Sequence, residues 1–380
     1  MNTSNSVGID FVGFPKGKLG IGDQVRSLMR LALHSGYKIN IIDCFHSSDR
    51  LVNDHQEFNE YISNVFKYPL RIYSLTQNHI AAMIYRSGTQ FFDNSMNIFH
   101  LAWEFEQRPT QLDPALHFAD EIWGISNFTS KAFANNYGIP VVTMHNSVDI
   151  QPFQKKSRQE FGLPDDCFLF CISMDFNSSL TRKNPFACIQ AFKSAFEGSA
   201  LTGLVIKISN VNPESPLWAK LLEMVKHMDN IYIINAVLER SVLNALFDCC
   251  DTYISLHRSE GFGLGMAENM LLGKPVICTG YSGNMDFCTA EHAYLVEYKV
   301  VEVGKGDYDF AEGFKWAEPS IDSAAVLMKY IFNNQQQAKL KAKEAKENIE
   351  QNFSSKALAK QFDGLVKKFL FKHEQNKWIK

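Results

Sequence analysis

Two glutamates frame a glycine-rich segment in the second half of the chain. Glu260 and Glu268 are separated by seven residues, and Gly261, Gly263 and Gly265 lie between them. An ionised carboxylate accepts two hydroxyl hydrogen bonds, which suits the vicinal diols of a hexose or a ribose. The pattern therefore indicates binding of sugar rings on either side of a turn that glycine keeps open.

The segments around these glutamates predict a strand, a tight turn and a helix. Residues 252–257 are β-branched and aromatic, and a helix is expected from near Gly263 to about Leu272. The first N–H groups of a helix lack intrahelical partners and carry partial positive charge, so the backbone at Phe262, Gly263 and Leu264 is predicted to bind a phosphate.

A structural interpretation of the same pair stays open. Glu260 could cap the helix and Glu268 could lie on a solvated face. If every residue between them were helical, the two carboxylates would lie roughly 80° apart around the helix axis, on no shared stripe. The glycine spacing favours the binding interpretation.

Composition limits the class of protein. A chain of 380 residues exceeds one usual core, so two domains are expected. A hydrophobic content of 46% and a charged content of 21% are typical of a globular protein, and a net charge of −3 argues against a nucleic-acid partner.

The charge is uneven along the chain. Residues 339–380 carry about six more positive than negative charges. A solvated helix with spaced charge pairs is one interpretation of this tail. The other is peripheral contact with an anionic membrane surface, through the lysines together with Phe369, Leu370, Phe371 and Trp378.

The eight cysteines favour a reducing compartment. They lie mostly in apolar segments and form no CxxC pair. The first residues lack a basic and apolar leader, and no run approaches the ~20 apolar residues of a membrane span. We expect a cytoplasmic protein that is soluble or peripheral on the inner face of the membrane.

Strand-like and helix-like segments alternate in both halves of the chain, which predicts an α/β fold of two Rossmann-like, doubly wound domains facing a central cleft. The predicted domains are 1–150, which would hold the acceptor, 151–353, which would hold the donor, and a helical tail 354–380 packing back on the first. The predicted strands are 7–14, 37–44, 79–84, 97–102, 121–125 and 141–145, then 168–174, 204–209, 231–235, 252–257, 275–279 and 294–297.

A second glycine-rich turn follows the first predicted strand. Gly20 and Gly22 would start a helix that runs to about His34, and they could bind the donor's phosphate or sugar. The spacing is not that of a dinucleotide-binding turn, although Asp43 ends the next strand. A purely structural turn is the alternative.

Two cations follow the strand 168–174. Arg182 and Lys183 stand just before Pro185, which fixes the start of the helix 186–196. Fixed positive charge at the carboxyl end of a strand is what a departing diphosphate needs. The alternative is a solvated surface pair.

His100 ends the strand 97–102 of the first domain. It is either a hydrogen-bonded core residue or a contact to a sugar hydroxyl. Asp307 and Asp309 resemble a metal-binding pair, but they lie in a polar glycine-rich loop with no strand before it and are interpreted as solvated. No His/Cys cluster has metal-ligand spacing, so neither a metal nor a cofactor is expected.

These motifs together resemble the retaining glycosyltransferases of family 4, which have the GT-B fold. The match rests on SLHRSEGFGLGMAENMLLGKPVICTGYSGNMDF, RKNPFACIQAF and the KLGIGD turn, and it is strongest with bacterial enzymes of O-antigen and capsule synthesis. The resemblance implies that Glu260 contacts the donor sugar, Glu268 the ribose, Lys183 the diphosphate and His100 the donor sugar. Many members have an arginine where this chain has Asp175, and Arg182 is the expected substitute.

The resemblance implies a hexosyltransferase that uses a nucleoside-diphosphate sugar and a saccharide or lipid-linked saccharide acceptor. Because no carboxylate nucleophile is evident, retention predicts a metal-independent front-face reaction, in which the departing phosphate takes the acceptor's proton. A GT-B epimerase or phosphorylase, and a catalytically idle nucleotide-sugar-binding subunit, are the alternatives. Acceptor contacts are expected from loops such as 46–66.

Overall fold

The computed structural model describes residues 7–45, 55–134 and 138–377, with no side chains for 375–377. The chain divides into two compact units. The first unit contains Met1–Val148 and Gln351–Lys380, and the second contains Asp149–Glu350. The predicted boundaries after residues 150 and 353 lie close to these divisions.

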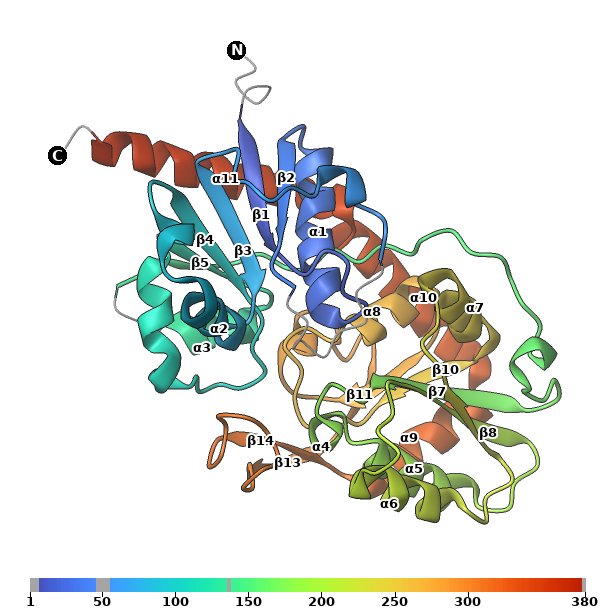
Figure 1. Ribbon diagram of the computed structural model, residues 1–380. Helices are drawn as coiled ribbons and strands as arrows, with labels where there is room; N and C mark the ends of the chain where they lie inside the picture. The colour runs from blue at the N-terminus through green and yellow to red at the C-terminus, as the bar shows by residue number, and fades with distance from the viewer. Residues whose placement is uncertain (1–6, 46–54, 135–137, 378–380) are drawn as a thin grey trace. The chain divides into compact units, whose positions relative to one another are not determined.

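The first unit is built on a parallel sheet of six strands in the order β2-β1-β3-β4-β5-β6 (Figure 1). The strands are β1 (Gly8–Gly13), β2 (Lys38–Asp43), β3 (Leu70–Leu75), β4 (Met96–Leu101), β5 (Glu121–Gly124) and β6 (Val141–Thr143). The helices are α1 (Gly20–His34), α2 (Gln77–Ser87), α3 (Asn127–Ala134) and α11 (Ser355–Lys377). Short 3-10 helices span Asn59–Tyr61, Gln90–Phe92 and Thr110–Phe118.

The C-terminal helix α11 packs against the first unit beside α1. Phe362 and Phe369 are buried in the core of this unit, and the Tyr37 hydroxyl donates to Asp363 at 2.8 Å. Burial of Phe369 removes it from the predicted membrane-facing set, whereas Phe371 is 61% exposed. Trp378 lies outside the described residues.

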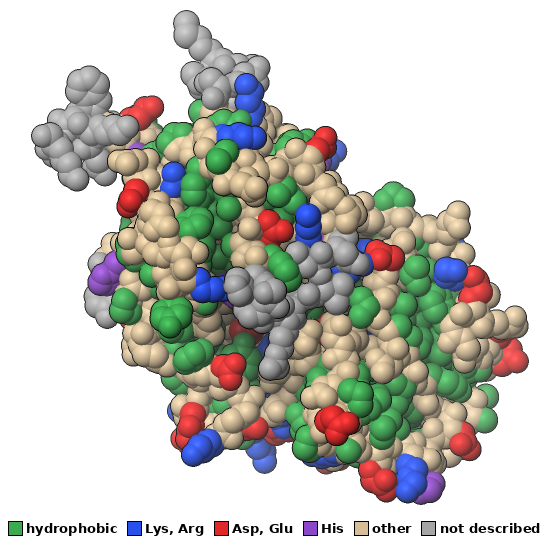
Figure 2. Space-filling view, viewed as in Figure 1, with side chains coloured by type: hydrophobic (Ala, Val, Ile, Leu, Met, Phe, Trp, Pro, Cys, Tyr) green, Lys and Arg blue, Asp and Glu red, His purple; other side chains and the backbone are tan. Residues whose placement is uncertain are grey.

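The lysine-rich tail shows the spaced charge pairs that one interpretation required. Lysines of α10 (Gln335–Asn352) and α11 pair with acidic residues four positions away, and these pairs are Lys343–Glu347, Lys346–Glu350 and Lys367–Asp363. On the face that Figure 2 shows, basic and acidic side chains are interspersed rather than gathered by sign. Among the described residues, no helix is both long enough and apolar enough to cross a membrane.

The second unit has a parallel six-stranded sheet in the order β12-β11-β10-β7-β8-β9. Its strands are β7 (Phe168–Asp175), β8 (Thr202–Ser209), β9 (Ile231–Asn235), β10 (Thr252–Ser255), β11 (Val276–Thr279) and β12 (Tyr294–Val296). The helices are α4 (Leu180–Lys183), α5 (Pro185–Phe196), α6 (Pro216–Val225), α7 (Arg240–Cys249), α8 (Leu264–Leu271), α9 (Ile321–Asn333) and α10 (Gln335–Asn352). Short 3-10 helices span Gln159–Phe161 and Gly283–Asp286.

Strand order in this sheet reverses between β7 and β10. From β7 the chain continues to β8 and β9 on one side, and from β10 it continues to β11 and β12 on the other. In open parallel sheets such a reversal opens a crevice at the carboxyl ends of the strands, where ligands bind. The loops from β7 to α4 and from β10 to α8 carry the predicted cations and glutamates.

The α/β fold class and the two Rossmann-like sheets are confirmed. One predicted strand is wrong, because residues 79–84 lie inside helix α2. Thr76 caps this helix by accepting the N–H of His79, and Ile80 and Met83 face the core at a helical spacing. The real strand, β3, was missed because Arg71 and Ser74 interrupt its apolar pattern, although all six of its residues are buried.

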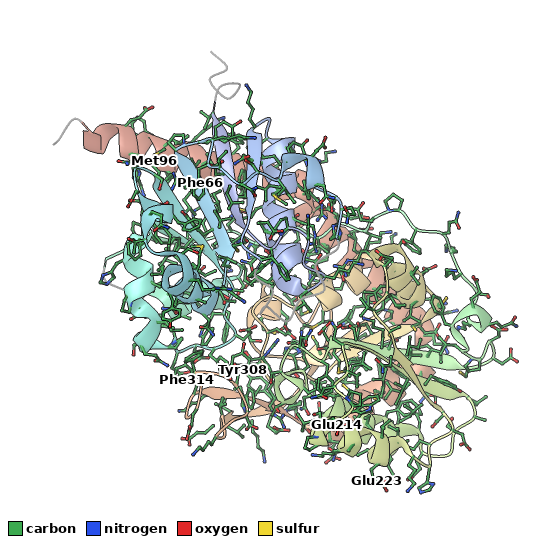
Figure 3. The ribbon with its side chains drawn as sticks, viewed as in Figure 1. Phe66, Met96, Glu214, Glu223, Tyr308 and Phe314 are labelled. Carbon is green, nitrogen blue, oxygen red and sulfur yellow. The ribbon has the colours of Figure 1, made fainter. Side chains whose placement is uncertain are left out.

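An antiparallel hairpin was also missed. Strands β13 (Tyr298–Glu302) and β14 (Lys315–Pro319) form a two-stranded sheet between β12 and α9. Its loop carries Asp307 and Asp309, and Figure 3 places Tyr308 and Phe314 on this part of the chain. The Asp307 carboxylate accepts the N–H of Gly304 within the loop.

Candidate active site

Glu260 lies in the loop between β10 and α8 and is held by two cations. Lys183 Nζ is 2.6 Å from its Oε1, and Arg182 Nη1 is 3.1 Å from its Oε2. The Glu260 N–H donates to the Ser282 hydroxyl at 2.8 Å. The structure thus brings together three of the predicted site residues at the carboxyl ends of β7 and β10.

The surroundings of Glu260 keep it ionised. Burial opposes ionisation, because only 7% of the residue is exposed, but the charges of Lys183 and Arg182 outweigh this and lower the pKa of Glu260 to about 2. A carboxylate in this state accepts hydrogen bonds and donates none, so it suits a substrate hydroxyl as partner.

The two cations have different roles in this geometry. Arg182 is buried and its Nη1 also donates to the Ser259 carbonyl at 2.7 Å, so it braces the loop that carries Glu260. The side chain of Lys183 is 26% exposed. Lys183 is therefore the cation better placed to meet an incoming anion.

Helix α8 begins at Leu264, next to the predicted start near Gly263. Gly263 precedes it with φ of +96°, a left-handed conformation that glycine adopts readily. Met266 and Ala267 donate their N–H groups to the Gly263 carbonyl. Within the described chain, the N–H groups of Leu264 and Gly265 have no acceptor, which leaves two donors for an anion.

At the other glycines, packing of neighbouring groups leaves no room for a side chain. A Cβ on Gly265 would lie 2.7 Å from the Tyr253 hydroxyl oxygen. A Cβ on Gly283 would lie 2.0 Å from the Gly261 carbonyl oxygen. Phe262 is buried and its ring packs against Phe287, with ring centroids 5.1 Å apart. These contacts fix the path of the turn.

Glu268 lies within α8 and is paired with Arg240, the first residue of α7. Arg240 Nη2 is 2.6 Å from Glu268 Oε1, and Glu268 itself is 4% exposed. A carboxylate beside an arginine can accept further hydrogen bonds from a ligand. Because Glu268 is buried, it does not lie on a solvated face of α8. The alternative interpretation of Glu268 as a solvated surface residue is therefore excluded.

Asp175 has a structural explanation. Its carboxylate accepts hydrogen bonds from the Ser209 hydroxyl at 3.0 Å and from the Asn210 amide at 2.7 Å, which ties the ends of β7 and β8 together. Lys207 is buried beside this network and donates to Ser209 at 2.9 Å. Burial lowers the pKa of Lys207, and Asp175 opposes that effect.

Several residues around the site were not found from the sequence. His257 is fully buried, and its Nε2 is 3.1 Å from Asn284 Oδ1. Burial lowers its pKa, while the charge of Glu260 acts in the opposite direction. Ser282 and Asn284 belong to the segment YSGN, which follows β11. A polar, glycine-containing segment directly after a strand is a sequence signal that could have indicated these two site residues. Arg240 had no comparable signal.

The remaining predicted site residues belong to the first unit. Helix α1 begins at Gly20, and a Cβ on Gly22 would lie 2.0 Å from the Gly17 carbonyl oxygen. Arg26 donates to the carbonyls of Pro15 and Gly17 at 2.8 Å, which holds the turn closed. The close packing at Gly22 agrees with the alternative interpretation of this segment as a purely structural turn. The donor-binding role of Gly20 and Gly22 stays a prediction.

His100 is fully buried on β4. Its Nε2 is 2.9 Å from the Met144 carbonyl, and its Nδ1 is 3.2 Å from the Ser74 hydroxyl. Burial lowers its pKa to about 4, so the ring is neutral at neutral pH. These contacts match the core interpretation of His100, and its contact with a donor sugar stays a prediction from the resemblance.

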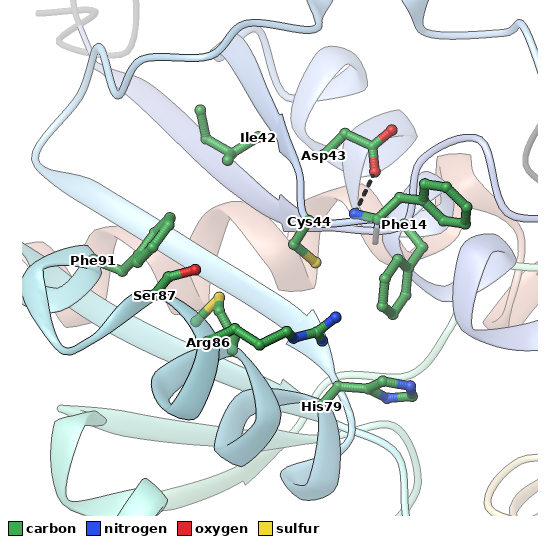
Figure 4. Close-up of a pocket in the computed structure, with 10 residues that line it drawn as sticks. Phe14, Ile42, Asp43, Cys44, His79, Arg86, Ser87 and Phe91 are labelled. Atoms are coloured by element: carbon green, nitrogen blue, oxygen red, sulfur yellow. Dashed lines mark hydrogen bonds between the residues drawn. The ribbon is translucent and has the colours of Figure 1, made fainter. Parts of the chain in front are cut away.

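A pocket of about 210 Å³ opens in the first unit (Figure 4). It lies at the carboxyl ends of β1 and β2, beside α2, and its lining is Phe14, Ile42, Asp43, Cys44, Phe45, His79, Met83, Arg86, Ser87 and Phe91. Asp43 accepts the Phe45 N–H at 3.0 Å, and burial raises the pKa of Asp43. Aromatic rings beside a carboxylate and a guanidinium suit a ring that carries hydroxyl groups.

The fold is shared with solved structures of low sequence identity. HepE of Anabaena, in complex with UDP and glucose, is 15% identical over 95% of this chain and 99% of its own, with a TM-score of 0.69. Sucrose-phosphate synthase from Thermosynechococcus elongatus is 14% identical over 96% and 99% of the two chains, with a TM-score of 0.70. A glycosyltransferase from Rickettsia africae is 14% identical over the same shares, 96% and 99%, with a TM-score of 0.66.

No protein-family model matches the sequence, and no curated protein sequence does. The likeness in structure therefore establishes the architecture. The chain has the GT-B fold, with two Rossmann-like units, as predicted.

Proposed function

We propose that this protein is a retaining glycosyltransferase that moves a hexosyl group from a nucleoside-diphosphate sugar to a saccharide or lipid-linked saccharide acceptor, in the synthesis of a bacterial surface polysaccharide. One observation carries the proposal. Glu260 is held ionised between Lys183 and Arg182, beside the unpaired N–H groups that begin α8, at the point where strand order reverses.

The donor would bind across this point in the second unit. The diphosphate would accept hydrogen bonds from Leu264 and Gly265, and from Lys183 once that side chain turns from Glu260. Glu260 would bind hydroxyl groups of the hexose, and Glu268, oriented by Arg240, would bind the ribose. The neighbours support this class of donor, because HepE was solved with UDP-glucose.

The reaction follows from these charges. The bond between the anomeric carbon and the diphosphate oxygen breaks as the acceptor oxygen attacks from the same face. The bonding electrons leave with the diphosphate, and the departing phosphate oxygen takes the acceptor's proton. Lys183 and the helix-start amides stabilise the negative charge that develops, so the proposal requires no metal.

The first unit would hold the acceptor. Its pocket offers aromatic rings together with Asp43 and Arg86, which are groups that bind saccharides. Residues 46–54 of the loop expected to contact the acceptor lie outside the described residues. Contact of α11 with an anionic membrane stays a prediction, supported by the exposed Phe371 between Lys368 and Lys372.

The test begins with a thermal-shift panel of UDP-, GDP- and dTDP-sugars, because a ligand that binds only the native state raises its melting temperature. The donor that binds is then incubated with the protein, and release of its nucleoside diphosphate is measured with and without candidate acceptors. We expect turnover by the wild type and its loss in Glu260→Gln. Turnover by Glu260→Gln at the wild-type rate would refute the proposal.

A further inference from the structure

The four-residue helix α4 carries both cations of the candidate site, and it needs support from outside. A single turn has too few internal hydrogen bonds to be stable alone. Its first residue is preceded by Ser179, whose hydroxyl caps the turn by accepting the Arg182 N–H at 3.1 Å. The carbonyl groups at its other end require donors from elsewhere in the fold.

Arg258 supplies those donors. Its Nη1 donates to the Thr181 carbonyl at 2.5 Å, and its backbone N–H donates to the Arg182 carbonyl at 2.8 Å. Arg258 therefore holds two consecutive carbonyl groups of α4, directly before Lys183. It lies between β10 and Glu260, so the same residue also fixes the loop that carries the glutamate.

The opposite side of Arg258 is held by the β13–β14 hairpin. Its Nε is 2.6 Å from Glu318 Oε2, its guanidinium lies over the Trp316 ring at 5.3 Å, and its carbonyl accepts the Ala317 N–H at 2.9 Å. The hairpin loop also reaches α4, because the Ser179 hydroxyl donates to the Asp307 carbonyl at 3.2 Å.

We infer that Arg258 is a positioning residue that, anchored by Glu318 and Trp316 of the hairpin, sets the α4 turn so that Lys183 and Arg182 face Glu260. The inference rests on the proposed function of that site. The planar guanidinium forms this bridge because it offers several donors in fixed directions, which a lysine cannot reproduce. The hairpin, which otherwise resembles a surface insertion, thereby acts on the diphosphate-binding cation.

The test measures binding of UDP, GDP and dTDP, and of the corresponding nucleosides, by calorimetry. Arg258→Gln is expected to weaken binding of the preferred diphosphate roughly tenfold, the size of a coupling within one hydrogen-bonded network, and to leave nucleoside binding unchanged. Arg258→Lys should recover only part of the loss. Glu318→Gln, a change at a 41% exposed side chain, should give a smaller loss in the same direction.

A matched control is Arg158→Gln. Arg158 has a side chain exposed to 17%, against 18% for Arg258, and likewise binds carbonyl groups and one carboxylate, that of Asp251. Its side-chain partners belong to Asp165, Cys167, Cys249 and Asp251, and none of these residues is part of the α4 turn. This variant should lower the melting temperature without changing diphosphate affinity. If Arg258→Gln behaves in the same way, the inference is wrong.

The decisive comparison uses Lys183→Gln. If Arg258 acts through Lys183, then Arg258→Gln should cost little further affinity when Lys183→Gln is already present, whereas a full additional loss would overturn the inference. If Lys183→Gln alone leaves diphosphate affinity unchanged, the proposed function of the site fails instead. The two failures are therefore distinguishable.

Discussion

The ammonium group of Lys183 lies 2.6 Å from the carboxylate of Glu260, although 77 positions separate the two residues in the chain. In this pairing the cation is partly exposed and the acid is buried. In the proposed function, an incoming diphosphate would offer Lys183 a second anionic partner, and the release of Glu260 would make its oxygens available to a sugar. The pair would then link binding of the diphosphate with binding of the hexose.

Replacing Lys183 should slow transfer, because the negative charge that develops on the departing diphosphate would lose a stabilising cation. Lys183→Gln is expected to lower the transfer rate by roughly 10²-fold, as loss of one preorganised charge-stabilising donor does. Initial rates with saturating donor would measure this effect. The control is Lys193→Gln, at a lysine of α5 that is 53% exposed and pairs with Glu197. Equal rates for the two variants would exclude Lys183 from the site.

Glu268 should matter for the nucleoside. Glu268→Gln keeps the shape of the side chain but removes the charge that Arg240 and a ribose hydroxyl would share, so nucleoside affinity should fall by about tenfold. Calorimetry with the nucleoside alone isolates this contribution. Glu223→Gln, at a 74% exposed glutamate, is the control. Unchanged nucleoside affinity in Glu268→Gln would remove Glu268 from the ribose site.

The pH profile of the reaction should reflect the lowered pKa of Glu260. With a pKa of about 2, this carboxylate is ionised throughout the range in which the enzyme can be assayed, so it should produce no acid limb in kcat/KM above about pH 4. In Lys183→Gln one of the charges that lower this pKa is gone, and the acid limb should move to higher pH. Identical acid limbs in both proteins would contradict this account of Glu260.

His100 should make stability depend on pH. Its pKa is about 4 in the folded protein and near 6.5 in the unfolded chain, so between these values the unfolded chain binds more protons. The stabilisation is fully present above pH 6.5 and is lost as the pH falls toward 4, by up to about 3 kcal/mol. Urea unfolding of the wild type and of His100→Gln over this range would measure the difference. Parallel pH dependences would show that His100 is not responsible, and His257 would then be the residue to replace.

The features that the sequence predicted best are those formed by residues close together in the chain. Glu260, the turn and helix α8 form one continuous segment, and Pro185 marked the helix that follows Lys183. Arg240 could not be predicted, because its partner Glu268 is 28 positions away and only the tertiary fold brings them together. The same holds for Arg258 and Glu318.

Two errors have local physical causes. Residues 79–84 were predicted as a strand because apolar residues are continuous there, whereas the Thr76 cap makes them helical. Gly265 was interpreted as room for a ligand, but the Tyr253 hydroxyl occupies that space. Composition does not distinguish a glycine that faces a ligand from one that faces a side chain.

Gly263 offers a test of the turn itself. Gly263 and Gly273 both have positive φ, but a Cβ on Gly263 would lie 3.1 Å from Asn284 Cβ, whereas one on Gly273 would meet nothing within 4 Å. Both alanine variants should lose stability through backbone strain, and Gly263→Ala should lose about 1 kcal/mol more and should also bind the diphosphate less tightly. Urea unfolding and calorimetry would show this. Equal effects of the two substitutions would argue against a specific role for the Gly263 turn.

The most direct measurement is a crystal structure of the protein soaked with the nucleotide sugar that stabilises it most. We predict that the diphosphate lies within hydrogen-bond distance of Lys183 Nζ and of the N–H groups of Leu264 and Gly265, with Glu260 on the hexose and Glu268 on the ribose. A nucleotide bound elsewhere, or one whose diphosphate touches neither Lys183 nor the start of α8, would contradict the account.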